Sequence, residues 1–195
     1  MVANNKFNTT QHSMTLFLDR DGVINHRIIG GYVTHYNQFV FNDGVLPALQ
    51  ILAQHFRRIV VVTNQQGIGK GLMTETDLHQ IHTQMINDVA AAGGRIDAVY
   101  YCPHLATAHC TCRKPQIGMA IQAQQQFNDI VFANSLMIGD SVSDLLFGRA
   151  AGTKTVFITN NQALPQTFDT LWADEILPDL ASFAKQYKTF SAKKT

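Results

Sequence analysis

Two aspartates that are one residue apart, Asp19 and Asp21, follow a short apolar run and precede a glycine. The apolar residues 16–18 are typical of a buried strand, and Gly22 is typical of the turn that ends it. Carboxylates at the carboxyl end of such a strand lie where open α/β sheets bind ligands. One could attack phosphorus and form an aspartyl-phosphate, while the other could protonate the leaving alcohol and later activate water. The short pattern also fits a strand that ends in a turn without chemistry.

Further polar residues follow the later apolar runs of the chain. They are Thr63 and Asn64 after 59–62, Arg113 and Lys114 after 98–102 and a cysteine cluster, and Asp140 and Asp144 after 135–138. Phosphoryl transfer needs residues of these types. It uses a nucleophile, an acid and base, donors for the phosphate oxygens, and carboxylates for a magnesium ion. Each residue alone has a structural explanation, such as a strand threonine, a solvated lysine or a helix-capping aspartate. Their joint placement at successive strand ends favours the functional interpretation.

The cysteine cluster that precedes Arg113 has the spacing of a metal site. Its members are Cys102, His104, Cys110 and Cys112, in the pattern C-x-H-x5-C-x-C. Three thiolates and one imidazole make a complete tetrahedral zinc set with no open position for catalysis. The alternatives are buried free cysteines or a strained Cys110–Cys112 disulfide, and His109 is a rival fourth ligand. We expect structural zinc, which would fix the loop that carries Arg113 and Lys114.

The elements that would position these residues alternate between strands and helices. Strands are predicted over 15–19, 59–63, 98–102, 135–138, 155–158 and 173–176, and helices over 45–56, from the cap Thr74 to 92, 117–127, 143–151 and 179–187. The alternation predicts an α/β fold, a Rossmann-like doubly wound parallel sheet with right-handed crossovers. The connection 23–43 is too short for a large cap domain. His79 and His82, on the helix after Thr74, are expected to be solvated.

Length and composition limit the possible functions. The 195 residues fit one domain, expected over 14–187, between a flexible tail 1–13 and a polar tail 188–195. A net charge of +1 leaves no basic footprint for nucleic acid. The apolar runs are too short to span a membrane, and 1–13 lacks the apolar core of a signal peptide. We therefore expect a cytoplasmic protein that binds neither nucleic acid nor a membrane. Its expected partner is the small phosphorylated metabolite that the phosphoryl-transfer residues indicate, and we expect the protein to be a monomer.

In this order, the residues resemble four motifs of the haloacid dehalogenase superfamily of phosphatases, over about 15–158. The motifs stand here as Asp19-Arg20-Asp21-Gly22-Val23, Thr63-Asn64-Gln65, Arg113-Lys114-Pro115 and Gly139-Asp140-Ser141-Val142-Ser143-Asp144. The resemblance implies that Asp19 is the nucleophile and Asp21 the general acid and base. It also implies that Thr63 and Lys114 hold the transferring phosphoryl group. The implied magnesium ligands are the Asp19 carboxylate, the Asp21 carbonyl and the Asp140 carboxylate, with Asp144 behind them.

Within the superfamily, the chain resembles the branch of the heptose 1,7-bisphosphate and histidinol-phosphate phosphatases. This rests on Asp-Arg-Asp-Gly-Val-Ile-Asn, Thr-Asn-Gln-Gln-Gly-Ile-Gly-Lys-Gly and Tyr-Cys-Pro-His…Cys-Thr-Cys-Arg-Lys-Pro. Segments 31–33 and 67–71 favour the heptose enzymes, whereas the short loop 102–112 favours the histidinol enzymes. Ser141 departs from the lysine that heptose enzymes usually carry. The family pattern selects His104 as the zinc ligand and implies substrate contacts from Asn64, Gln65, Gln66 and Arg113.

The resemblance therefore implies a magnesium-dependent phosphomonoesterase that works through an aspartyl-phosphate, with zinc as a structural cofactor. The expected substrate is D-glycero-D-manno-heptose 1,7-bisphosphate at its 7-phosphate, and the alternative is histidinol phosphate or another small metabolite. A different class of function is a zinc-stabilised binding domain without catalysis. The presence of Asp19, Asp21, Lys114 and Asp140 argues against that class.

Overall fold

A six-stranded, entirely parallel sheet forms the centre of the molecule, in the order β3-β2-β1-β4-β5-β6. The computed structural model describes residues 14–164, 166 and 168–191, so the predicted tail 1–13 and residues 192–195 lie outside it. The strands are β1 (Thr15–Leu18), β2 (Arg58–Asn64), β3 (Ala98–Cys102), β4 (Ser135–Gly139), β5 (Lys154–Ile158) and β6 (Glu175–Leu177). Strands β2 and β3 follow one another on one side of β1, and β4 then pairs with the other side of β1. The strand order therefore reverses between β1 and β4, where open sheets of this kind bind ligands.

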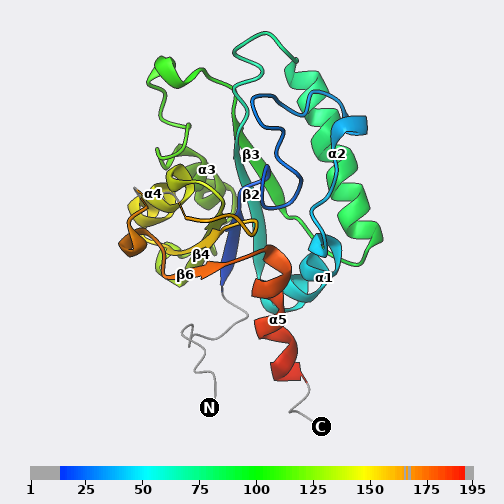
Figure 1. Cartoon of the computed structure of the whole chain (residues 1–195), viewed down its shortest axis with the longest axis vertical. Coiled ribbons are helices and arrows are strands. Elements are labelled where there is room, and N and C mark those ends of the chain that lie inside the picture. The colour runs from blue at the N-terminus through cyan, green and yellow to red at the C-terminus, as the bar shows by residue number, and fades with distance from the viewer. Residues whose placement is uncertain (1–13, 165, 167, 192–195) are drawn as a thin grey trace.

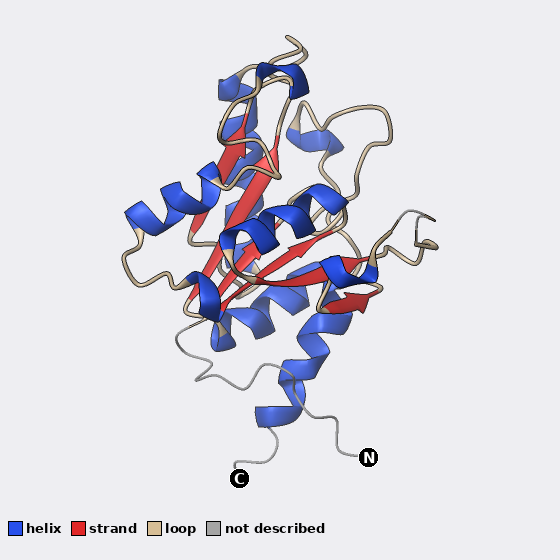
Figure 2. Cartoon of the chain, turned by 90° about the vertical axis from the view of Figure 1, so that its left-hand side faces the viewer, coloured by secondary structure: helices blue, strands red, loops and turns tan. Residues whose placement is uncertain are grey.

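Helices cover both faces of this sheet (Figures 1 and 2). They are α1 (Val45–His55), α2 (Glu75–Ala91), α3 (Gly118–Gln126), α4 (Val142–Ala151) and α5 (Leu180–Ser191). Leu16 and Leu18 of β1 pack toward α1, α2 and α5, whereas Phe17 between them packs toward α3 and α4. This alternation follows from the two-residue period of a strand, and it divides the core into two layers. The predicted doubly wound α/β fold is confirmed.

Local sequence signals explain where several helices begin and end. The Thr74 hydroxyl accepts a hydrogen bond from the Asp77 N–H, 3.1 Å away, and the Asp77 carboxylate accepts one from the Thr74 N–H at 2.8 Å. This reciprocal capping box starts α2 at the residue that the sequence indicated. In contrast, α5 continues to Ser191 beyond the predicted end at Tyr187. Tyr187, at the predicted end, is buried with its ring 5.3 Å from that of Phe56, so this part of α5 packs beside the end of α1.

The connection between β1 and α1 forms a folded loop over the strand ends and no separate domain. The Tyr36 ring stacks on that of Phe39, with centroids 5.3 Å apart, and the Phe41 ring meets Phe39 edge-on at 5.0 Å. The Tyr36 hydroxyl donates a 2.5 Å hydrogen bond to Asp88, which ties this loop to α2. Loops therefore cover this end of the sheet, as expected for a fold without a large cap domain. Among the described residues, no helix has the length and apolar character needed to cross a bilayer.

Candidate active site

The ends of three adjacent strands bring the predicted phosphoryl-transfer residues together. Leu18 of β1 pairs with Val61 of β2 and with Ile138 of β4, so β1 lies between the other two strands. Asp19 continues β1 and donates its backbone N–H to the Ile138 carbonyl at 2.9 Å. Thr63 near the end of β2 and Asp140 after β4 consequently lie on either side of Asp19. The sheet topology thus converts residues far apart in sequence into one site.

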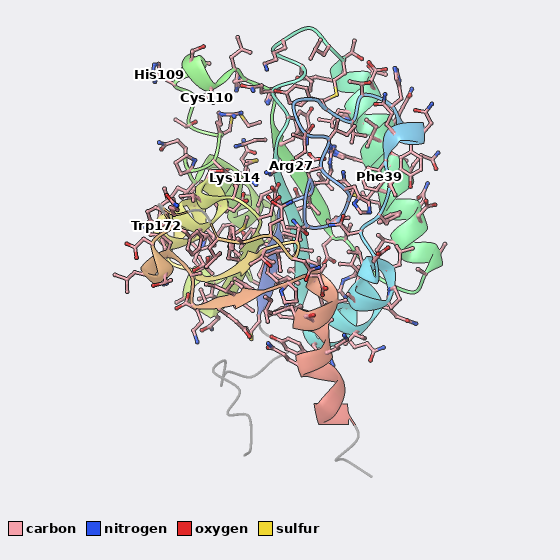
Figure 3. The ribbon with its side chains drawn as sticks, in the orientation of Figure 1. Arg27, Phe39, His109, Cys110, Lys114 and Trp172 are labelled. Atoms are coloured by element: carbon pink, nitrogen blue, oxygen red, sulfur yellow. The ribbon has the colours of Figure 1, made fainter. Side chains whose placement is uncertain are left out.

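Lys114 reaches this site from the loop after β3 (Figure 3). Its ammonium lies 2.8 Å from Asp19 Oδ1 and 2.6 Å from Asp144 Oδ1, and it donates a hydrogen bond to the Val62 carbonyl at 2.7 Å. Asn64 fixes the lysine backbone, because its side-chain amide accepts from the Lys114 N–H and donates to the Lys114 carbonyl. Burial alone would lower the pKa of Lys114, but the two carboxylates outweigh it and raise the pKa. Lys114 is therefore a fixed, charged group beside Asp19.

Asp21 is held by donors on several sides. The Arg20 guanidinium donates to both carboxylate oxygens at 2.9 Å, and amide groups of Asn25 and Gln65 donate at 2.9 and 2.8 Å. Burial alone would raise the pKa of Asp21, but these donors outweigh it and lower the pKa. In the free protein Asp21 is therefore an ionised carboxylate with a fixed orientation.

His82 supports Arg20 from α2, and the expectation that His82 is solvated is wrong. The side chain is buried, and its Nε2 lies 3.2 Å from Arg20 Nη1, which can donate to it. Burial is the main cause that lowers the pKa of His82 to about 3, so the ring is neutral. The buried α2 positions Leu78, Ile81, Met85 and Val89 share the face of His82, and this helical spacing could have revealed its burial. His79, in contrast, is exposed and pairs with the Tyr101 hydroxyl at 2.9 Å.

A cluster of carboxylates occupies the β1–β4 end of the site. Oxygens of Asp19, Asp140 and Asp144 all lie within 4.8 Å of one another. Burial, followed by the charge of Asp144, raises the pKa of Asp19 to about 6, and burial with the charge of Asp19 raises the pKa of Asp140 to about 8. Gly22 lets Asp140 approach, because a Cβ at this position would lie 1.8 Å from Asp140 Oδ2. Such a cluster of oxygen donors fits a hard cation such as Mg²⁺.

Within the cluster, Asp144 and Asp140 have different partners. One Asp144 oxygen pairs with Lys114, and the other accepts from the Ser141 N–H at 3.0 Å and from its hydroxyl at 2.6 Å. Asp144 is therefore occupied as a partner of Lys114 and a cap of α4. Asp140 instead contacts a cation from the loop, Arg27, whose Nη2 lies 2.7 Å from Asp140 Oδ1. No sequence pattern indicated this contact across 113 positions.

A cavity of about 400 Å³ opens beside Asp19. Its lining includes the predicted residues Asp21, Thr63, Asn64, Arg113 and Lys114, and the basic and aromatic residues Arg27, Lys70 and Tyr32. Gln65 and Gln66 do not line it. Gln65 is buried and donates to Asp21 and to the Thr63 hydroxyl, while Gln66 donates to the Tyr32 hydroxyl at 2.8 Å. These two glutamines hold neighbouring residues and do not face the cavity as the sequence led us to expect.

The cysteine cluster lies at the end of β3, just before Arg113 and Lys114. The Sγ atoms of Cys102, Cys110 and Cys112 and a nitrogen of His104 all lie within 4.8 Å of one another. All three cysteines are free thiols, so the disulfide alternative is wrong. His109 is not part of the group, and Figure 3 shows its side chain beside Cys110 in the loop beyond β3. Three sulfurs and one imidazole nitrogen at such separations fit a tetrahedral zinc ion.

Known proteins match most of the chain. Residues 111–183 match the HAD-hydrolase-like family model. A D-glycero-α-D-manno-heptose-1,7-bisphosphate 7-phosphatase from Mycobacterium bovis is 37% identical over 169 residues, which cover 83% of this chain and 89% of the relative. A D-glycero-β-D-manno-heptose-1,7-bisphosphate 7-phosphatase from Pasteurella multocida is also 37% identical, over 180 residues that cover 89% of this chain and 96% of the relative. Overall identity therefore does not separate the α from the β anomer.

Solved structures agree with these matches. A D,D-heptose 1,7-bisphosphate phosphatase from B. bronchiseptica, complexed with magnesium and phosphate, has a TM-score of 0.78 and 30% identity. The alignment covers 91% of this chain and 99% of that chain. A putative HAD-like phosphatase from Mesorhizobium loti has a TM-score of 0.71 at 24% identity, covering 90% of this chain and 86% of that chain, and shows the shared fold alone.

Proposed function

We propose a specific reaction for this chain, which belongs to the haloacid dehalogenase superfamily of phosphatases: magnesium-dependent removal of the 7-phosphate from D-glycero-D-manno-heptose 1,7-bisphosphate. The observation that carries the proposal is the Asp19 carboxylate at the end of β1, with the Lys114 ammonium 2.8 Å from one of its oxygens. A carboxylate nucleophile needs such a cation, because an anionic phosphate would otherwise be repelled. The named relatives support the choice of a heptose bisphosphate.

In the first half of the proposed reaction, an Asp19 oxygen attacks phosphorus while the bond from phosphorus to the sugar oxygen breaks. Lys114 and the Thr63 hydroxyl bind the phosphoryl oxygens. The leaving alkoxide takes a proton from Asp21. The nearby phosphate charge raises the pKa of Asp21 when substrate binds, which allows the carboxyl group to carry that proton.

In the second half, water attacks the aspartyl-phosphate and releases inorganic phosphate. Asp21 accepts the proton of the attacking water and is then protonated again, as it was in the complex with substrate. The donors Arg20, Asn25 and Gln65 keep the Asp21 carboxylate in place for both halves. This second carboxylate favours hydrolysis over a persistent phosphoenzyme, because the attacking water needs a base.

Two metal ions would complete the site. The carboxylates of Asp19 and Asp140 and the carbonyl of Asp21 would hold Mg²⁺, which when bound would neutralise charge on the transferring phosphoryl group. Cys102, His104, Cys110 and Cys112 would hold a structural Zn²⁺. The zinc ion would keep the segment before Lys114 in one conformation.

The cavity supports a substrate with a second phosphate, because Lys70 and Arg113 line it in addition to Lys114. Histidinol phosphate, which has one phosphate and a cationic amine, is the second candidate, favoured by the short loop 102–112. Ser141 also lines the cavity, so the position usually occupied by lysine in the heptose enzymes carries a neutral hydroxyl here.

Hydrolysis of heptose 1,7-bisphosphate, followed by ³¹P NMR with Mg²⁺, tests the proposal. We expect the 7-phosphate signal to be replaced by inorganic phosphate while the 1-phosphate signal remains. Asp19→Asn should lower kcat by about a thousandfold or more, since the amide is a poor nucleophile. Unchanged circular dichroism would show that this variant still folds. Turnover by Asp19→Asn at the wild-type rate would contradict the proposed chemistry.

A further inference from the structure

The Arg27 guanidinium lies among the oxygens that would hold magnesium. Its Nη2 is 2.7 Å from Asp140 Oδ1, 3.4 Å from the Asp21 carbonyl oxygen and 3.9 Å from Asp19 Oδ2. These three groups are the ones to which the proposed function assigns the metal. We propose that Arg27 is the resident cation among these oxygens: Mg²⁺ must displace its guanidinium, which then becomes available to a substrate phosphate.

The charges of the site explain why a resident cation is needed. Asp19, Asp140 and Asp144 place three carboxylates close together, and among the described residues the acidic partners of Lys114 are Asp19 and Asp144. Arg27 supplies the second cation and pairs with Asp140. When the metal is absent, this contact reduces the repulsion between Asp140 and Asp19.

Arg27 and Lys114 differ in how easily each could leave. The Lys114 side chain is 1% exposed and also donates a hydrogen bond to the Val62 carbonyl, so it is held in place inside the protein. The Arg27 side chain is 41% exposed, and the polar contacts of its guanidinium in the described part of the chain are the three metal-site oxygens. Once a metal occupies those oxygens, these contacts no longer hold the guanidinium in place.

The surroundings give the released side chain a place to bind. Arg27 lines the cavity of about 400 Å³ that contains Asp19, Lys70 and Arg113. It also lines the adjoining cavity of about 540 Å³ that contains Asp140. A guanidinium can bind two phosphate oxygens at once, so Arg27 would strengthen a cavity that already carries lysine and arginine. This inference rests on the proposed function, because it uses the same metal ligands and the same phosphate-binding cavity.

Calorimetric titration of Mg²⁺ without substrate tests the inference. We expect Arg27→Gln to bind Mg²⁺ about tenfold more tightly than the wild type, because the metal no longer competes with a charge-assisted hydrogen bond. Lys70→Gln is the matched control, since Lys70 is a cation of the same cavity, and its Mg²⁺ affinity should stay within about twofold of the wild type. Equal or weaker Mg²⁺ binding by Arg27→Gln would overturn the inference. So would an equal gain in Lys70→Gln, because it would indicate a general charge effect.

NMR of the arginine Nε–Hε groups supplies a second readout. The Arg27 signal, identified by its loss in Arg27→Gln, should shift when Mg²⁺ is added, whereas the signal of Arg58 on the Phe127 ring should not. An Arg27 signal unaffected by saturating Mg²⁺ would overturn the inference. If the wild type hydrolyses heptose bisphosphate and Arg27→Gln shows no gain in Mg²⁺ affinity, only this inference fails. If the gain appears but the sugar phosphate is not hydrolysed, only the proposed substrate fails.

Discussion

Asp19 and Asp21 are separated in sequence by Arg20 alone, yet their surroundings move their pKa values in opposite directions. Burial and Asp144 raise the pKa of Asp19 to about 6. Asp21 is partly buried, which alone would raise its pKa, but Arg20 and two amide donors lower it. Such divergence is common where two carboxylates have different tasks. It is consistent with one aspartate that is paired with Lys114 and a metal, and another that exchanges protons.

The binding of Mg²⁺ should depend on pH because protons compete for its ligands. The raised pKa values, about 6 for Asp19 and about 8 for Asp140, mean that both carboxyl groups of the free protein are protonated in part near neutral pH. Deprotonation frees the ligand oxygens, so affinity should increase roughly tenfold or more from pH 6 to pH 8.5. Calorimetry at several pH values measures this dependence. Equal affinity across that range would contradict it, and Asp140→Asn should bind Mg²⁺ weakly at every pH.

At the level of secondary-structure elements, the loop after β3 connects the predicted zinc site to Lys114, the lysine to which we assign a role in catalysis. Cys112 is followed directly by Arg113 and Lys114, and Asn64 at the end of β2 holds the Lys114 backbone. The position of the ammonium thus depends on β2 and on the cysteine loop together.

Removal of zinc should therefore reduce activity because Lys114 is displaced, and not because the zinc ion takes part in the reaction. After chelation and return to excess Mg²⁺, we expect kcat/KM to fall by about tenfold or more, because small displacements of a catalytic group are costly. Added Zn²⁺ should restore both the metal content and the rate. Full activity in zinc-free protein, verified by metal analysis, would show that the loop does not need the ion.

Helix α2 contributes a pH-dependent part of the stability through His82. The folded pKa of about 3 lies below the unfolded value of about 6.5, so the unfolded state binds more protons and stability falls as pH decreases below 6.5. His82→Gln keeps an acceptor for Arg20 and does not titrate. The unfolding free energy of the wild type should decrease by about 2 kcal/mol relative to this variant between pH 7.5 and pH 5. Parallel pH profiles in urea denaturation would show that His82 is not responsible.

At the scale of the whole molecule, the sequence predicted the elements well and the side-chain contacts less completely. Apolar periodicity and a capping box located the strands and α2, because these signals are local. The contacts of Arg27 with Asp140 and of His82 with Arg20 join segments that are far apart in sequence. Their partners depend on how the end of β1, the loop that follows it and α2 come together in three dimensions, and no local pattern specifies that. Gln65 illustrates the same point. The motif predicts a substrate contact, but the side chain is buried and bonds Asp21 and Thr63 instead of lining the cavity.

The reversal of strand order between β1 and β4 brings the site residues together. It places Asp19 in the middle of the sheet edge, between groups contributed by β2 and by β4. The topology thus accounts for the phosphatase chemistry, whereas the cavity residues Arg27, Lys70, Arg113 and Ser141 would determine which phosphate ester enters.

The most direct test of the account is kcat/KM of the purified protein with Mg²⁺, compared between heptose 1,7-bisphosphate and histidinol phosphate. We expect a preference of about a hundredfold or more for the heptose bisphosphate, which corresponds to about 2.7 kcal/mol of differential transition-state binding. A comparable preference for histidinol phosphate, or similar and poor rates on both, would contradict the proposed substrate.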